Sequence, residues 1–436
     1  MKVSIFGMGY VGVVSAACLL GDGHEIVGID PVDVKVADVC RGRSPVQEAG
    51  VAELLAAGHQ AGRLHATTSP AEGLDNSDMA WICVGTPSDS DGGINLTAVE
   101  TVIGQIGQAL RDSGQRPLIV VRSTCLPGTT KDRLIPLLAK QSGLTVGRDI
   151  DLVFHPEFLR EGSAVEDFLA PPKIVVGEDR RSAADRLLEV YEGYEAPVYR
   201  LSTGEAEMVK YSDNLFHALK ITFANEIGAV AKSAGVDARK VAEVFCADTT
   251  LNISPRYLRP GPAFGGSCLP KDLRAILRLA SLKSVKAPML EGILDSNDAQ
   301  IDRVVERICA QQPRTVGIVG LAFKADTDDM RESPYVKVAK ALIGEGIALR
   351  IHDPVVQPDR LIGSNKEQVH NALRHLEEVL VGSLDDLTAA DLIVVNHPIV
   401  DAARIRSWLD AGTAVLDTVG IEGVDPRTPG YEGLYW

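Results

Sequence analysis

The first thirty residues contain a glycine-rich turn in a context that few folds can accommodate. The apolar run 3–6 leads into GMGYVG, with Gly7, Gly9 and Gly12, and a stretch of small residues with a helical pattern follows. A strand, a glycine turn and a helix in this order form the phosphate-binding turn of a Rossmann unit. Asp30 ends the next predicted strand, where a carboxylate accepts from the ribose hydroxyls of NAD and repels the 2′-phosphate of NADP. We therefore predict NAD binding.

Hydrophobic patterning divides the 436 residues into three regions. Short apolar strands alternate with helical stretches to about residue 200, which is typical of a doubly wound, mostly parallel sheet. A proline-free helical pattern runs from about 204 to 234, and further helical segments reach about 300. We predict an α/β chain with an N-terminal Rossmann domain (1–200), a central all-helical domain with a long helix (201–300) and a C-terminal Rossmann-like α/β domain (301–436). The predicted strands are 3–6, 25–30, 79–84, 118–121, 152–154, 174–176, 315–320, 349–353, 392–395 and 414–416.

The overall composition excludes several classes of protein. Hydrophobic residues make up 45% of the chain and charged residues 24%, but no run of eighteen apolar residues occurs, so no membrane span is predicted. The first residues enter a strand directly, without the basic segment of a secretory signal, and we predict a cytoplasmic location. The net charge of −15 disfavours nucleic acid as a partner. Seven cysteines lie scattered without metal-ligand spacing, which predicts reduced thiols and no metal site.

A second glycine-rich segment has the composition of a site for thiol chemistry. In FGGSCLPKD, Cys268 follows two glycines and precedes Lys271 and Asp272 by three and four residues. A nucleophilic cysteine needs backbone room for a substrate, a nearby cation that favours the thiolate, and a group that handles protons. A dinucleotide site and a cysteine nucleophile in one chain predict oxidation through a covalent thioester. The other six cysteines are predicted to be packing residues.

Polar residues on the predicted long helix form a further candidate site. Lys210, Asn214, His217 and Asn225 recur at spacings that share one helical face, among apolar neighbours. Amides with one lysine favour a hydrogen-bonding wall for a polar ligand, where Lys210 and Asn214 can polarise a substrate oxygen. For His217, a ligand contact is no better an interpretation than a histidine that is hydrogen-bonded within the protein or exposed at its surface.

Three loops that follow predicted strands add hydroxyl and carboxyl groups. Thr86 in VGTP and Thr124 in VRST lie at the strand ends where open α/β sheets bind ligands. A helix N-cap or a turn hydroxyl explains either threonine as well. Glu157 and Glu161 in HPEFLREG follow the strand 152–154 and are predicted on successive helical turns. Taken alone, they have the pattern of surface acids on a helix.

The motifs together are more specific than any of them alone. The chain contains, in this order, GMGYVG, VGTP, VRST, PEFLRE, the Lys210/Asn214 pair, FGGSCLPKD and GLAFKADTDDMRESP. It resembles the UDP-glucose/GDP-mannose dehydrogenase family along nearly its full length. The resemblance implies a four-electron oxidation of the C6 alcohol of a nucleotide sugar to a carboxylate, with two NAD molecules reduced in turn. GDP-mannose is favoured as the substrate, and UDP-glucose or a UDP-N-acetylhexosamine is the alternative.

The resemblance also implies an assembly and a role for each domain. Residues 1–200 would bind NAD, 201–300 would form the dimerisation and active-site domain, and 301–436 would bind the nucleotide sugar. The expected homodimer interlocks through the central helices, and each active site is completed by the partner subunit.

Individual residues acquire implied roles as well. Cys268 would form a thiohemiacetal and then a thioester, which Glu161, supported by Glu157, would hydrolyse. The residues implied to hold a water and to stabilise the oxyanion are Thr124, Lys210, Asn214 and Asp272. Those implied to contact NAD are Gly7, Gly9, Tyr10, Val11, Gly12, Asp30, Lys35, Thr86, Thr124, Lys271 and Arg331. Those implied to contact the nucleotide sugar are Glu161, Lys210, Asn214, His217, Asn225, Arg256, Tyr257, Arg259, Pro262, Gly265 and Lys324.

Two positions depart from the family pattern, and two other functions remain open. Arg256 stands where mannose-type relatives tend to carry a second aromatic residue, and Pro262 replaces a bulkier apolar residue; both positions concern the choice of sugar and base. A two-electron, NAD-dependent hydroxyacid dehydrogenase shares the Rossmann and helical domains but has no use for Cys268 or for the C-terminal unit. In a non-enzymatic NAD sensor or scaffold, Cys268 would be incidental.

Overall fold

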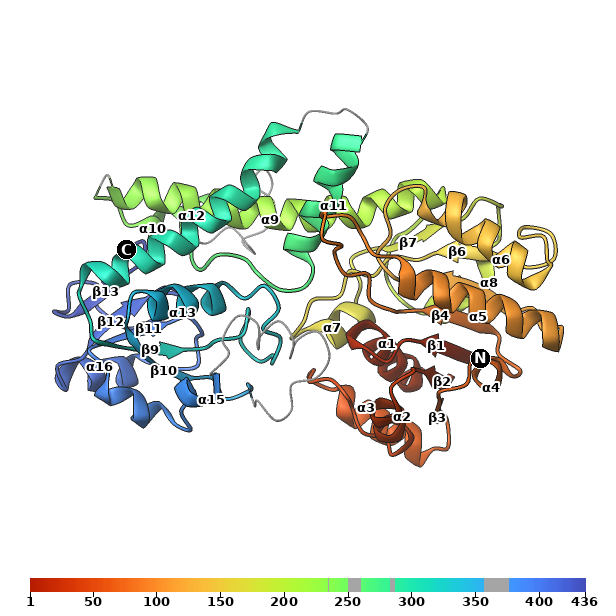
Figure 1. Ribbon diagram of the computed structural model, residues 1–436, viewed down its shortest axis with the longest axis horizontal. Helices are drawn as coiled ribbons and strands as arrows, with labels where there is room; N and C mark the ends of the chain where they lie inside the picture. The colour runs from red at the N-terminus through yellow and green to blue at the C-terminus, as the bar shows by residue number, and fades with distance from the viewer. Residues whose placement is uncertain (234, 250–259, 283–286, 357–375) are drawn as a thin grey trace. The chain divides into compact units, whose positions relative to one another are not determined.

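The computed structural model describes residues 1–233, 235–249, 260–282, 287–356 and 376–436 (Figure 1). The chain divides into two compact units, Met1–Asp213 with Arg274–Leu282 and Asn214–Leu273 with Lys283–Trp436. Each unit contains one α/β sheet, and the stretch of chain between the two sheets is helical. The predicted fold class is therefore confirmed.

The N-terminal sheet has the strand order of a dinucleotide-binding fold. Its eight strands lie in the order β3-β2-β1-β4-β5-β6-β7-β8, and of the neighbouring pairs only β6 and β7 are antiparallel. The first six positions of this order are those of the Rossmann fold. The strands are β1 (Lys2–Phe6), β2 (Glu25–Ile29), β3 (Leu64–Thr67), β4 (Met79–Ile82), β5 (Leu118–Val121), β6 (Leu152–Phe154), β7 (Ile174–Gly177) and β8 (Val198–Leu201).

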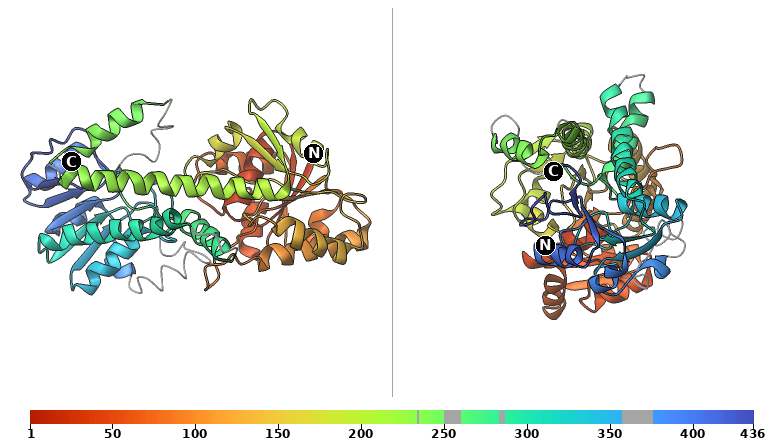
Figure 2. Two further views of the ribbon diagram at one scale, coloured as in Figure 1. Left: turned by 90° about the horizontal axis from the view of Figure 1, so that it is seen from above. Right: turned by 90° about the vertical axis from the view of Figure 1, so that its left-hand side faces the viewer.

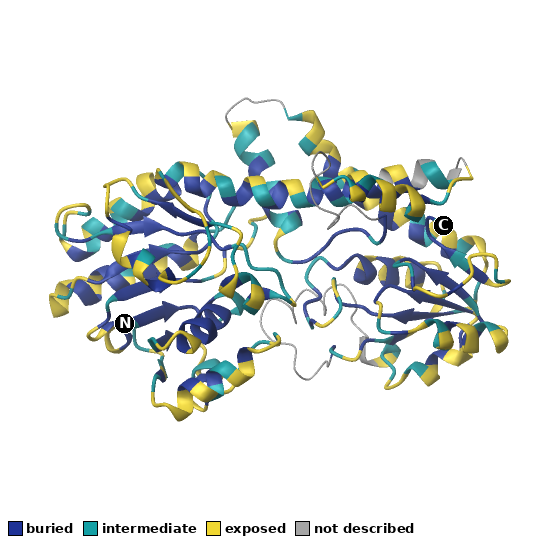
Figure 3. Cartoon of the chain, turned by 180° about the vertical axis from the view of Figure 1, so that it is seen from behind, coloured by how far each residue is buried: buried dark blue, intermediate teal, exposed yellow. Residues whose placement is uncertain are grey.

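Apolar side chains fill both faces of this sheet. Alternate residues of β1 point to opposite sides, so Ile5 belongs to one apolar cluster with Val13 and Phe6 to another with Ile103. The central strands are therefore buried on both faces, as Figure 3 shows in dark blue. The helices of this unit are α1 (Tyr10–Gly21), α2 (Asp33–Cys40), α3 (Val51–Gln60), α4 (Pro70–Leu74), α5 (Thr97–Ser113), η1 (Thr130–Leu134), α6 (Ile135–Ser142), α7 (Ala164–Leu169), α8 (Asp185–Leu188) and η2 (Glu189–Tyr191).

The central helices begin with α9 (Thr203–Ser233), which Figure 2 shows as one long rod. A capping box starts it, because the Ser202 N–H donates to Glu205 Oε2 at 2.8 Å and the Glu205 N–H donates to Ser202 Oγ at 3.4 Å. Gly235, with a φ of +74°, follows its end and donates to the Lys232 carbonyl. The predicted long helix is confirmed. The other central helices are α10 (Ala238–Ala247), α11 (Leu269–Leu282) and α12 (Pro288–Ala310).

The C-terminal unit contains a second, smaller sheet of parallel strands. In the described residues its strands lie in the order β10-β9-β11-β12-β13, and all neighbouring pairs are parallel. Its elements are β9 (Thr315–Val319), α13 (Pro334–Gly344), β10 (Ala348–His352), α15 (Leu376–Val379), η4 (Leu384–Ala389), β11 (Leu392–Val395), α16 (Ala402–Asp410), β12 (Ala414–Asp417) and β13 (Tyr431–Gly433). Among the described helices of both units, none combines the length and the apolar composition that crossing a membrane requires.

Among the described residues, three strands were not predicted, and each of them lies at the edge of a sheet. They are β3 and β8 in the N-terminal sheet and β13 in the C-terminal sheet. Three of the four residues of β8 are exposed, so it lacks the apolar run that marked the central strands. An edge strand pairs on one side only and needs less apolar burial, which leaves a weaker pattern in the sequence.

Candidate active site

The glycine turn after β1 has the geometry that a dinucleotide needs. Gly7 has a φ of +95°, and a Cβ on Gly12 would lie 1.9 Å from the Gly7 carbonyl oxygen, so both positions require glycine. A Cβ on Gly9 would meet no atom within 4 Å. The open space at Gly9 is therefore suited to the close approach of a pyrophosphate to the backbone, at the start of α1. Tyr10 and Val11, the first residues of that helix, are half-buried.

Asp30 is fixed directly against this turn. Its carboxylate accepts from the Met8 N–H at 2.8 Å, from the Val32 N–H at 3.0 Å and from Lys35 Nζ at 3.3 Å, and the residue is 4% exposed. Asp30 and Lys35 thus lie together at the end of β2. Contact of either residue with NAD stays a prediction.

The loops after β4 and β5 are joined by hydroxyl groups. Thr86 Oγ1 donates to the Thr124 carbonyl at 3.0 Å, and Ser123 Oγ donates to the Val84 carbonyl at 2.6 Å. The two predicted threonines therefore come from different strands and lie in one cluster at the carboxyl edge of the sheet.

The loop after β6 contributes a buried ion pair. Glu157 Oε1 lies 2.8 Å from Lys210 Nζ of α9, with side chains that are 7% and 4% exposed. The Leu159 N–H donates to the other carboxylate oxygen at 2.7 Å. Burial raises the pKa of Glu157, but the Lys210 charge, these hydrogen bonds and the charge of Arg122 together hold that pKa below its usual range. Lys210 is thus paired with Glu157, and the pair is ionised at neutral pH.

The prediction that Glu157 and Glu161 occupy successive helical turns is wrong. Residues 155–160 have no regular secondary structure, and α7 begins only at Ala164. Side-chain carboxylates hold the backbone of this loop, because Arg160 N–H donates to Asp167 and Gly162 N–H donates to Glu48, in place of the carbonyls of a helix. Glu161 is half-buried in this loop, while Glu157 is buried.

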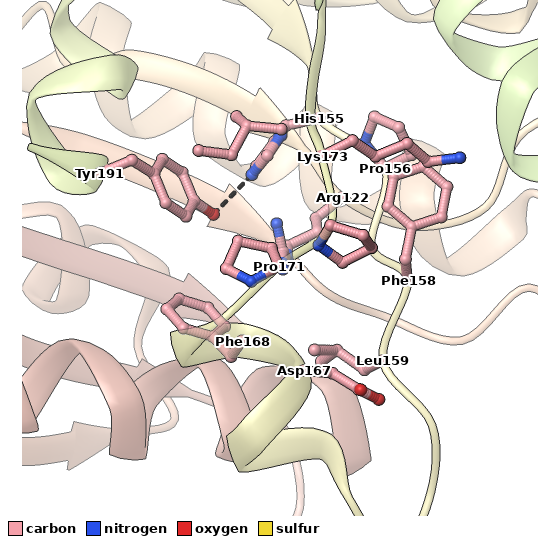
Figure 4. A pocket seen from close by; sticks show the side chains of 12 residues that line it. Arg122, His155, Pro156, Phe158, Leu159, Asp167, Phe168, Pro171, Lys173 and Tyr191 are labelled. Atoms are coloured by element: carbon pink, nitrogen blue, oxygen red, sulfur yellow. Dashed lines mark hydrogen bonds between the residues drawn. The ribbon is translucent and has the colours of Figure 1, made fainter. Parts of the chain in front are cut away.

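A small pocket lies at the loop after β6, and its lining includes His155, Pro156 and Phe158 (Figure 4). In it, His155 Nδ1 donates to the Val175 carbonyl at 2.7 Å and His155 Nε2 accepts from the Tyr191 hydroxyl at 2.6 Å. Burial, reinforced by the Arg122 charge, lowers the pKa of His155 to about 3, so the imidazole is neutral. The guanidinium of Arg122 stacks on Trp81, 5.1 Å from the ring centre. The cavity of about 30 Å³ holds no more than a water or two.

The loop that carries the cysteine packs closely against the C-terminal domain. A Cβ on Gly265 would lie 2.5 Å from the Glu332 carbonyl oxygen, and a Cβ on Gly266, whose φ is +86°, would lie 2.9 Å from the Phe323 ring. Both glycines are therefore needed for this approach. Cys268 itself is exposed and immediately precedes α11, where the helix N-terminus favours a thiolate.

Asp272 connects the cysteine helix with the long helix. Its buried carboxylate accepts a hydrogen bond from Asn214 Nδ2 and lies 2.9 Å from Lys271 Nζ. Asp272 N–H also donates to the Cys268 carbonyl at 2.8 Å, in the first turn of α11. The structure thus brings Cys268, Lys271, Asp272 and Asn214 into one cluster, as their proposed shared chemistry requires.

The side chain of Asn225 is hydrogen-bonded to the loop before the cysteine, and its contact with the nucleotide sugar stays a prediction. Its side-chain oxygen accepts from the Gly261 N–H at 2.8 Å and its amide donates to the Pro262 carbonyl at 3.4 Å, so it holds the loop before the cysteine. Two side chains of α12 bond to the same loop. Asn297 accepts from the Phe264 N–H and donates to the Phe264 carbonyl, and the Gln300 amide donates to the Gly261 carbonyl. Sequence reasoning missed both, because buried amides on a helix carry no motif.

The remaining predicted residues lie near these clusters or outside the described residues. Lys324 and Arg331 adjoin Phe323 and Glu332, the two residues packed on the glycines of the cysteine loop. Arg331 forms a bidentate ion pair with Asp329, with N–O distances of 2.6 and 2.9 Å. His217 is half-buried on α9. Arg256, Tyr257 and Arg259 lie outside the described residues.

All seven cysteines are described, and none forms a disulfide. Four are buried, Cys309 is half-buried, and Cys268 and Cys40 are exposed, so Cys40 is not the packing residue that we predicted.

A Rossmann sheet with a glycine turn open at Gly9 defines a dinucleotide-binding protein. Sequence models of the UDP-glucose/GDP-mannose dehydrogenase family match residues 1–195 (NAD binding domain), 204–299 (central domain) and 317–421 (UDP binding domain). The chain belongs to this family.

Relatives and solved structures agree with this assignment. The GDP-mannose 6-dehydrogenase of Pseudomonas putida is 44% identical over 438 residues, which span 100% of both chains. The structure of a UDP-glucose dehydrogenase from Pyrobaculum islandicum has a TM-score of 0.88 at 34% identity, over 100% of this chain and 98% of that one. A ternary complex of GDP-mannose dehydrogenase from Pseudomonas aeruginosa matches over 100% of both chains, at 43% identity and a TM-score of 0.58.

Proposed function

We propose that this protein oxidises the C6 alcohol of a nucleotide sugar, GDP-mannose in preference, to the carboxylate with NAD. The observation that carries the proposal is a cysteine in a tightly packed glycine loop, clustered with Asp272 and Asn214, in a chain that also has the open glycine turn of an NAD site. Neither a two-electron hydroxyacid dehydrogenase nor a simple NAD-binding protein needs such a loop.

The reaction divides into two oxidations and one hydrolysis. NAD, when bound, supplies the two-electron oxidant for each oxidation. The first converts the C6 alcohol to an aldehyde, and Cys268 Sγ adds to the aldehyde carbon to form a thiohemiacetal. The second oxidation gives a thioester on Cys268. Water then adds to the thioester carbon, and its collapse releases the carboxylate and restores the thiol.

The surrounding side chains fit these steps by their chemistry. Lys210, paired with Glu157, and Asn214, bonded to Asp272, are donors for an oxygen that gains negative charge. Glu161 is proposed as the acid and base for the water that attacks the thioester. The Thr124 hydroxyl is proposed to orient that water, while Thr86 holds the Thr124 backbone.

The choice of sugar rests on the relatives. GDP-mannose is the preferred substrate because relatives that match this chain over its full length, at 44% identity, are named GDP-mannose 6-dehydrogenase. UDP-glucose is the alternative, since a UDP-glucose dehydrogenase structure is also similar. Arg256 and Pro262 are the residues proposed to alter this preference. We propose that each predicted domain binds one ligand, with NAD bound by residues 1–200 and the nucleotide sugar by residues 301–436. The proposed location of the protein is the cytoplasm.

Counting reduced cofactor tests the proposal directly. With GDP-mannose and excess NAD, we expect two NADH per sugar consumed, measured by absorbance together with chromatography of the sugar acid. One NADH per substrate would contradict the four-electron reaction. A thermal-shift panel of GDP-mannose, UDP-glucose and UDP-N-acetylmannosamine identifies the sugar, because a bound ligand stabilises the fold as the logarithm of its concentration over Kd.

The exposed side of α9 supports the proposed homodimer. Phe216, Phe223 and Ile227 recur at helical spacing and are 39%, 43% and 41% exposed. An apolar stripe of this kind is suited to a second copy of the chain. We expect sedimentation equilibrium to give twice the chain mass of 46.6 kDa, and Phe223→Glu to give a monomer with little activity, since the partner would complete each site. A monomeric and fully active parent protein would contradict the assembly.

A further inference from the structure

Glu48 gathers three hydrogen bonds from two distant segments of the N-terminal unit. Its Oε2 accepts from the Gly162 N–H at 2.7 Å and from the Tyr10 hydroxyl, and its Oε1 accepts from the Ala164 N–H at 2.9 Å. Tyr10 lies in the glycine-rich segment at the start of α1, whereas Gly162 follows Glu161 directly and Ala164 comes two residues later. One carboxylate therefore joins the cofactor turn to the loop of the proposed acid and base.

The bond to Ala164 replaces a missing helix cap. Ala164 is the first residue of α7, and Ser163, in the N-cap position, makes no capping hydrogen bond with its side chain. The N–H groups of a first helical turn need an acceptor from outside the helix, and a negative charge there also meets the favourable end of the helix dipole. Glu48, 116 residues earlier in the chain, supplies both.

The bond to Gly162 fixes the residue next to Glu161. Gly162 has a φ of +86°, which favours glycine and bends the chain between the proposed acid and base and α7. With N–H groups at both Gly162 and Ala164 held by Glu48, the backbone that carries Glu161 is held on its C-terminal side. On the N-terminal side of Glu161, residues 155–160 have no regular secondary structure, so no helix holds the loop from that side.

The Tyr10 hydroxyl is the donor in its bond to Glu48. Burial, the hydrogen bond to Glu48 and the negative charges of Glu48 and Glu161 all raise the pKa of Tyr10. The phenol therefore keeps its proton and acts as the donor to Glu48.

We propose that Glu48 is a positioning residue that fixes the Glu161 loop to the cofactor turn and thereby supports hydrolysis of the Cys268 thioester. The inference rests on the proposed function, because it assigns Glu48 to one step of that reaction. The two oxidations depend on it less, since Glu48 touches the cofactor side through Tyr10 alone.

Glu48→Gln tests the role while keeping the size of the side chain. The amide has one acceptor oxygen, so it cannot serve the donors at both Glu48 oxygens. We expect kcat to fall about tenfold or more, within the range that general acid–base catalysis contributes, with KM for NAD changed about threefold at most. Quenching during turnover and weighing the intact protein is expected to show the acylated Cys268 accumulating. Glu178→Gln is the matched control, because Glu178 also accepts from a backbone N–H, that of Ala184 at 2.9 Å, without a link to Tyr10 or the Glu161 loop.

Two further variants separate the possible outcomes. Tyr10→Phe removes one bond and keeps the carboxylate, so it should accumulate less acyl-enzyme than Glu48→Gln; equal accumulation would move the role to Tyr10 and overturn the proposal. Glu161→Gln should accumulate acyl-enzyme strongly. If it does and Glu48→Gln behaves like the Glu178 control, the role of Glu48 is refuted while the function stands. If acyl-enzyme forms in none of them, the thioester route itself fails.

Discussion

Cys268→Ser is expected to abolish formation of the sugar acid, by about a thousandfold or more, as removal of a catalytic nucleophile does in other enzymes. Serine has nearly the same size, but its hydroxyl ionises far less readily than a thiol, so it cannot capture the aldehyde efficiently. The reaction should stop after the first oxidation. Rapid-quench analysis of the sugar and NADH absorbance measure this, and at most one NADH per sugar is expected.

Cys40→Ser is the matched control for this change. Cys40 is the other exposed cysteine among the seven, and its thiol donates to the Ala66 carbonyl in the N-terminal unit. The control variant should turn over like the parent. Acid formation by Cys268→Ser at the parent rate would remove the covalent step from the mechanism.

Lys210→Met is expected to destabilise the fold by about 3 to 5 kcal/mol, because it leaves the buried Glu157 carboxylate without its ion-pair partner. Urea unfolding followed by circular dichroism measures the loss. The double variant Lys210→Met/Glu157→Gln should recover much of it, since no buried charge then remains unpaired. Lys173→Met is the control, because Lys173 pairs with Asp213 at 2.5 Å with both side chains about a quarter exposed, and such pairs contribute at most about 1 kcal/mol.

The effect of pH gives a second measurement on the same pair. The lowered pKa of Glu157 means that the pair stabilises the parent above the pKa of about 4.3 of an unfolded glutamate, and that this contribution is lost as the pH falls through the folded pKa. The stability gap between Lys210→Met and the parent should therefore be largest at neutral pH and shrink below about pH 4.3. A gap that does not change with pH would show that lost packing, and not the charge of Glu157, causes the destabilisation.

Local patterns predicted the parts of this protein that depend on nearby residues. The glycine turn, the long helix and the central strands all follow from short-range chemistry, since backbone sterics, helix periodicity and two-sided burial act over a few residues. The same reasoning failed at Glu161, where a helical spacing was interpreted as a helix. The carboxylates of Asp167, seven residues beyond Arg160, and of the distant Glu48 hold that loop instead, and the helical spacing contains neither of them.

Asn225 and Glu48 also show which contacts the sequence could not predict. The sequence marked Asn225 as polar on an apolar helix, but only the fold shows that its amide holds the backbone at Gly261. Glu48 lies outside every motif, although its carboxylate joins Tyr10 to the segment after Glu161.

The sequence alone therefore determined the fold class, the NAD turn and the family, because each is encoded in contiguous residues, and it predicted the nucleophilic role of Cys268. The tertiary structure alone decided which charges are paired, as in Glu157 with Lys210, and which loops are held in place. Those properties arise from hydrogen bonds between segments tens to more than a hundred residues apart, and such contacts exist only after the chain has folded.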